Sequence, residues 1–168
     1  DYDRALPAYK RVRELLADFE PGTKEAQLEK IRGINALAGL YVRMGKYEKA
    51  MQICVEALRT IEGVSETIEH AAVFTTIGMA NYFRGNLNQA ITFHTRSLEI
   101  EEKLGDATEM VLTLNNLGDA YMALGRYQDA KQCFDRAVEL SEEVGDPYGR
   151  ALSLHGLGNF YLAMGVVQ

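Results

Sequence analysis

The chain has few of the residues that would interrupt helices or build a small cross-linked fold: its 168 residues include three prolines, two cysteines and no tryptophan. Cys54 and Cys133 stand 79 residues apart, without the spacing of a metal or redox motif. We therefore expect reduced thiols, a cytoplasmic location, and neither a metal nor another cofactor.

Long apolar runs and an excess of positive charge are also missing. No run approaches the roughly 18 apolar residues of a membrane-spanning helix, and no basic-then-apolar leader follows Asp1. The formal net charge is −6 and the isoelectric point is near 5.1. Because nucleic-acid binding needs Lys and Arg to replace counterions, we expect no direct nucleic-acid contact, no membrane insertion and no attraction to anionic lipid.

The sequence instead contains a repeat with a period of 40 residues. The best copy spans residues 115–130, and related copies stand 40 and 80 residues earlier and 40 residues later. Three slots carry the pattern: a glycine, an alanine and, in three of four copies, a tyrosine. Their members are Gly78, Gly118 and Gly158; Ala50, Ala90 and Ala130; and Tyr41, Tyr121 and Tyr161.

Apolar residues within each copy recur at intervals of three and four, which predicts amphipathic helices. Each unit is expected to hold a helix A and a helix B joined at a glycine, within one array over residues 1–168. The predicted divisions are an unpaired helix B at 1–20, full units at 24–64, 65–104 and 105–144, and helix A of a truncated unit at 145–168.

Several residues are suited to helix ends. Pro21 and Gly22 are expected to end the first helix, and Ser65 and Asp106 to cap later ones. Pro147 is suited to a first helical position. Since glycine inside a helix costs about 1 kcal/mol relative to alanine, we attribute the recurring glycine to close approach of helix B.

The spacing Leu-Gly-x-x-Tyr followed by Gly-x-Tyr-x-x-Ala at residues 117–130 resembles the tetratricopeptide repeat. The 40-residue period, with Gly-Asp between units, is similar to repeats of Pins-type adaptors, kinesin light chains and bacterial signalling regulators. The resemblance implies an all-α fold, a right-handed α-solenoid whose helices A line a concave groove.

If the Leu-Gly-x-x-Tyr residues of helix A face inward, another stripe of the same helix faces the groove. The resemblance implies that groove asparagines hold an extended peptide; the alternative is that these are solvated positions or bonds between helices. Asn116 could instead be buried and bonded to the next unit. The candidate ligand-binding residues are Arg32, Asn35, Arg43, Thr75, Met79, Phe83, Asn115, Asn116, Asp119, His155 and Asn159.

Evidence for catalysis is weak. The three histidines lie in different predicted helices, and His94 shares a slot with Cys54 and Phe134, which indicates a core position. The adjacent Glu101 and Glu102 are expected on a solvated helix face. We therefore expect no enzyme.

The sequence predicts a protein–protein interaction module that binds a partner peptide or helix in the concave groove. It would serve as the adaptor or sensor part of a larger signalling protein. The alternative is a scaffold for oligomerisation or intramolecular docking, in which the unpaired terminal helices stack on another copy.

Overall fold

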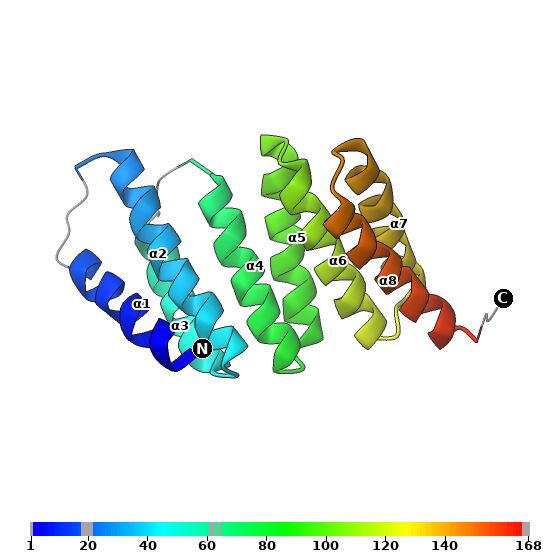
Figure 1. Cartoon of the computed structure of the whole chain (residues 1–168), viewed down its shortest axis with the longest axis horizontal. Helices are drawn as coiled ribbons and strands as arrows, with labels where there is room; N and C mark the ends of the chain where they lie inside the picture. The colour runs from blue at the N-terminus through cyan, green and yellow to red at the C-terminus, as the bar shows by residue number, and fades with distance from the viewer. Residues whose placement is uncertain (1, 18–21, 61–62, 64, 166–168) are drawn as a thin grey trace.

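The computed structural model describes residues 2–17, 22–60, 63 and 65–165, and this part of the chain forms eight α-helices and no strand. Figure 1 shows the helices standing side by side, with α1 at one end and α8 at the other. Their bounds are α1 Tyr2–Ala17, α2 Lys24–Arg43, α3 Tyr47–Thr60, α4 Ile68–Phe83, α5 Leu87–Leu104, α6 Ala107–Ala123, α7 Tyr127–Glu143 and α8 Pro147–Ala163.

The helices follow one another as hairpins, in which α2, α4, α6 and α8 are helices A and α3, α5 and α7 are helices B. Tight turns join α2 to α3, α4 to α5 and α6 to α7, and Gly85 between α4 and α5 has a φ of 81°, a left-handed conformation that favours glycine. The all-α solenoid predicted from the repeat is confirmed. The exact division of the chain into units stays a prediction.

The array curves with helices A on its inner side. Successive helices A contact one another, α2 with α4 and α6 with α8, while α4 and α6 meet at only a few positions. Within the described ranges, α3, α5 and α7 make no comparable contacts with one another. The row with the shorter spacing must lie on the inside of the bend.

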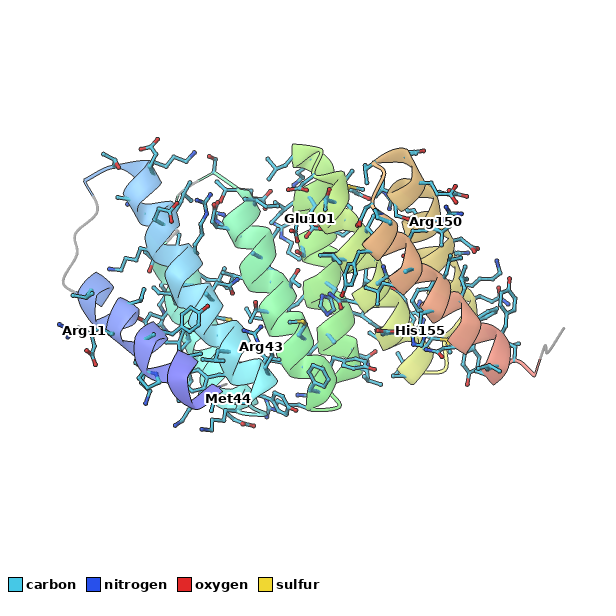
Figure 2. All side chains as sticks on the ribbon, viewed as in Figure 1. Arg11, Arg43, Met44, Glu101, Arg150 and His155 are labelled. Carbon is cyan, nitrogen blue, oxygen red and sulfur yellow. The ribbon has the colours of Figure 1, made fainter. Side chains whose placement is uncertain are left out.

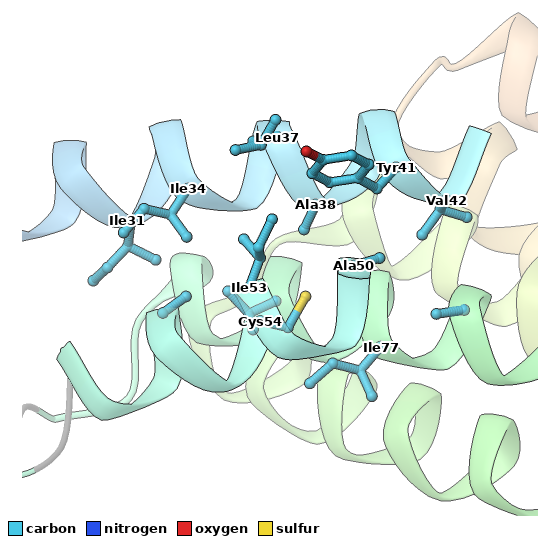
Figure 3. Close-up of a cluster of buried hydrophobic side chains, with 13 residues drawn as sticks. Ile31, Ile34, Leu37, Ala38, Tyr41, Val42, Ala50, Ile53, Cys54 and Ile77 are labelled. Atoms are coloured by element: carbon cyan, nitrogen blue, oxygen red, sulfur yellow. The ribbon is translucent and has the colours of Figure 1, made fainter. Parts of the chain in front are cut away.

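An apolar core fills the space between the two rows. Figure 3 shows its first part, where Ile31, Ile34 and Ala38 of α2 extend toward α3, which contributes Ile53 and Cys54. Ala50, Ala90 and Ala130 are fully buried, as are the small residues Ala57, Ser97 and Ala137 one period apart on helices B. Small side chains at these two slots let neighbouring helices approach closely.

The recurring glycines accommodate a ring rather than the backbone of helix B. A Cβ atom at Gly118 would lie 2.4 Å from Phe134 Cε1, and one at Gly78 would lie 2.6 Å from His94 Cε1. Gly156 faces the opposite side of the same Phe134 ring, again at 2.4 Å. Gly158 has open space around it in the described chain, where no helix B follows α8, so its assignment to this class stays a prediction.

Two glycines of α8 therefore give opposite predictions. Gly156→Ala should lower the free energy of unfolding by about 1–3 kcal/mol, because the new methyl group overpacks against Phe134. Gly158→Ala should raise it by about 1 kcal/mol, because alanine is the better helix former and meets no neighbour. Urea denaturation followed by circular dichroism would measure both, and a matching loss in both variants would contradict the assignment.

The helix ends agree with most of the predicted caps. Asp106 accepts a hydrogen bond from the Glu109 amide, and Pro147 opens α8. Ser65 is not the cap of α4; Thr67 is, because its amide donates to His70 Nδ1 and its backbone is extended. The expected helix end at Pro21 lies outside the described residues, although α1 ends at Ala17.

Glu101 was wrongly placed on a solvated face, since only 1% of it is exposed. Its Oε1 atom lies 2.9 Å from Ser97 Oγ and 2.9 Å from Thr113 Oγ1, between α5 and α6 (Figure 2). Burial raises the pKa of this carboxyl group, although the two hydroxyl groups oppose that shift. Ser97 also faces the Ala71 carbonyl oxygen at 2.7 Å, so a protonated Glu101 would supply a donor that the cluster needs.

Candidate ligand-binding groove

The inner face formed by helices A, called the groove below, carries most of the predicted ligand-binding residues at its surface. Arg32 is exposed on α2, but its Nε donates to Glu69 Oε1 on α4 at 2.8 Å. Burial raises the pKa of Glu69, yet hydrogen bonds from Thr67, its own backbone and Arg32 bring the net pKa below its usual value. Arg32 is thus occupied by a partner within the protein and is poorly suited to bind an acidic ligand.

Arg43 is exposed at the last position of α2, at the other end of that helix (Figure 2). His155 and Asn159 are exposed on α8, and His155 Nε2 lies 3.2 Å from Asn159 Nδ2. These three residues are available at the groove surface.

One repeat position holds Asn35, Thr75 and Asn115. The side chains at this position contact neighbouring helices more than they face the groove. Asn115 is 3% exposed, and its amide donates to the Val111 carbonyl oxygen and to Ser153 Oγ of α8, each at 2.8 Å. Its predicted place on the exposed face is therefore wrong. Thr75 Oγ1 lies 2.8 Å from Ser97 Oγ of α5, and Asn35 is half-buried with no partner for its Oδ1 atom.

The other four predicted residues come together where α4 and α6 separate. Met79, Phe83, Asn116 and Asp119 line a cleft of about 80 Å³, together with Tyr82 and His94. We call it the α4–α6 cleft. Asn116 is half-buried there, and the neighbour-bonded asparagine is Asn115 instead. Tyr82 and His94 were not among the predicted binding residues.

The electrostatics of the α4–α6 cleft are set by one carboxylate beside a neutral ring. His94 is 1% exposed, and burial lowers its pKa to about 4, so it is neutral at pH 7. Loss of solvent raises the pKa of Asp119, and nearby His155 opposes that change. Loss of solvent, and secondarily Asp119, raise the pKa of Tyr82. The carboxyl group of Asp119 is therefore the acidic group of the cleft, and it lies beside an uncharged His94 ring.

Other kinds of site find little support in the described ranges. No group of three or more His, Cys, Asp or Glu side chains there is arranged to hold a metal ion. Cys54 is buried, as predicted, and burial raises its pKa to about 12, which makes it a poor nucleophile. In the part of the chain that the structure describes, no helix combines the length and apolar character needed to cross a membrane.

A curved row of helical hairpins with a groove on its inner side defines a helical-repeat protein of the kind that serves as an interaction scaffold. Residues 30–103 and 109–165 match the family model described as tetratricopeptide repeat. The chain belongs to the tetratricopeptide repeat family.

Solved structures show the same fold at low sequence identity. BtubC (BKLC) from P. vanneervenii matches with a TM-score of 0.83 and 18% identity over 97% of this chain and 66% of its own. A Rap protein complexed with Competence and Sporulation Factor matches with 0.83 and 20% over 98% of this chain and 44% of its own. PlcR from Bacillus thuringiensis, in complex with the peptide PapR7 and DNA, matches with 0.76 and 16% over 90% and 54%. Comparison with curated proteins finds no significant match.

Proposed function

We propose that the groove binds a peptide or a helix of a partner protein, and that the chain is the adaptor or sensor part of a larger cytoplasmic signalling protein. The observation that carries this proposal is the α4–α6 cleft, a hollow on the inner face with apolar walls and a few polar groups. Ligand-binding pockets commonly combine these two features.

Two structural neighbours support the proposal. PlcR is complexed with the peptide PapR7, and a Rap protein is complexed with Competence and Sporulation Factor. This chain spans about half the length of each, so it corresponds to part of such proteins. PlcR is also complexed with DNA, but a net charge of −6 does not favour direct DNA binding by this chain.

Phe83 is the groove residue best suited to anchor a ligand. It is 57% exposed and stacks on Tyr47 of α3, with the ring centroids 5.9 Å apart. Exposed aromatic side chains held in place by neighbours contribute heavily to binding because they lose little conformational entropy. Arg43, Met79 and Asn159 lie on the same row of helices and can add polar and apolar contacts.

Replacing Phe83 with Ala is expected to weaken the binding of peptides selected on this protein by about tenfold or more, which corresponds to about 1.4 kcal/mol. The peptides would come from a random library displayed on phage, and calorimetry would measure their affinity. The matched control is Leu104→Ala on α5, which removes an apolar side chain of similar exposure from a helix B. Equal affinity for all three proteins would contradict a groove site.

Self-association through a terminal helix is a second candidate. Leu154, Tyr161 and Leu162 of α8 are at least 41% exposed, so this helix presents apolar surface that another copy could cover. Light scattering of each protein at the concentrations used for calorimetry would show whether dimerisation contributes to the measured heats.

A further inference from the structure

We propose that the α4–α6 cleft holds the basic head group of one Lys or Arg side chain of a bound peptide. This inference rests on the proposed function, since it assigns the chemistry of one residue in the ligand. It names Asp119 and His94 as the acceptors and the Tyr82–Phe83 pair as the aromatic wall.

The size of the cleft suits a compact polar group. Its volume is about 80 Å³, and on the same measure one water molecule needs about 10–15 Å³. The cleft therefore has room for several waters, or for an ammonium or guanidinium head group in their place.

The charge of the cleft selects a cation. Asp119 has the only carboxyl group among the residues that line it, and no ion-pair partner for Asp119 is found in the described part of the chain. His155 is the titratable group that lowers the pKa of Asp119, and it already contacts Asn159. An acidic ligand group would be repelled here, whereas a cation would neutralise Asp119.

His94 adds an unused hydrogen-bonding atom. Its ring is almost fully buried, and Nδ1 has no hydrogen-bond partner. An unpaired buried polar atom destabilises the protein, and a matching ligand group would remove that cost. When the proton of the neutral ring is on Nε2, Nδ1 is an acceptor: an N–H donor of the ligand would satisfy it, while an apolar side chain would leave it unpaired.

The apolar wall is also suited to a cation. Tyr82 and Phe83 meet edge to face, with ring centroids 5.4 Å apart and an interplanar angle of 78°. Phe83 leaves more than half of its surface open to the groove. Aromatic faces attract ammonium and guanidinium groups, so this wall and Asp119 favour the same ligand.

A small-molecule titration tests the cleft directly. Methylguanidinium chloride is the probe, its neutral isostere N-methylurea is the comparison, and ionic strength is held constant with sodium chloride. The side-chain NMR signals of His94 are expected to shift saturably with methylguanidinium, with at least tenfold weaker binding of N-methylurea. Asp119→Asn should abolish the difference in affinity between the two probes. Glu139→Gln removes the same charge at an exposed position of α7 and should preserve that difference.

The results separate this proposal from the proposed function. Equal responses to the two probes, or an unchanged response in Asp119→Asn, would overturn the cation site. If selected peptides bind the groove but show no Lys or Arg preference that depends on Asp119, the cation site fails and the peptide groove stands. If methylguanidinium binds and no library peptide does, the cleft selects cations but its assignment to a peptide is overturned.

Discussion

Replacing Phe134 with Ala is expected to lower the free energy of unfolding by about 3–5 kcal/mol, the usual loss for a buried phenylalanine. Phe134 is 1% exposed, and its ring fills the space between Gly118 of α6 and Gly156 of α8. Its removal leaves a cavity that joins three helices from two units. Urea denaturation would measure the loss, and hydrogen exchange would place it in α6, α7 and α8.

Two controls make the Phe134 result specific. Phe83→Ala removes the same atoms from a position that is 57% exposed, and should cost less than about 1 kcal/mol. In the Phe134→Ala background, Gly156→Ala should no longer destabilise, because the ring it would overpack against is absent. Purely additive effects of the two substitutions would show that the packing of the Phe134 ring does not require glycine at position 156.

Acidification from pH 7 to pH 4 is expected to remove about 3 kcal/mol of stability through His94 alone. The pKa of His94 is near 4 in the folded protein and near 6.5 when the chain is unfolded. A depressed folded pKa gives a contribution that is complete above the unfolded value and is lost as the pH falls through the folded value. Each pKa unit corresponds to about 1.36 kcal/mol, which gives this magnitude.

The measurement is a difference between two proteins. Urea denaturation from pH 4 to pH 7 would compare the parent with His94→Phe, which carries the residue found one period later at Phe134. Glu101 has a raised pKa, so its contribution is present below the unfolded value and is lost as the pH rises. This opposite trend is common to both proteins and cancels. Parallel pH profiles would show that His94 titrates normally.

Much of the fold could be predicted from the sequence because its determinants are local and repeated. A 40-residue period, left-handed glycines such as Gly105, and an Asp106 cap each act within one or two helical turns. The recurring glycine position could be recognised from its period, but the predicted explanation was only partly correct. Helix B does approach these glycines closely, but through a side-chain ring rather than through its backbone. Two helices touch one ring from opposite sides, and the single period of sequence around Gly118 does not contain Gly156.

The site was harder to predict because burial depends on the partner across the helix interface. Asn115 and Asn159 look alike in sequence, yet Ser153 lies opposite Asn115 and draws its amide into the interface. Glu101 lies inside because Ser97 and Thr113 supply hydroxyl groups to it. The other units have Ala57 and Ala137 at the position of Ser97. Ser97, at a position where the neighbouring units have alanine, was the sequence feature that could have indicated the burial of Glu101. Tyr82 and His94 reach the cleft only because α4 and α6 diverge.

The small contact between α4 and α6 has a mechanical consequence. Bending stiffness in a solenoid comes from the contacts between neighbouring units, and here the inner row is held most weakly at this junction while α5 still joins α4 to α6. Within the inner row, the separation between neighbouring helices should therefore change most easily at this point. A ligand that bridges α4 and α6 would hold these two helices at a fixed separation. Binding in one small cleft would then set the pitch of the superhelix and change the shape of the array along its length.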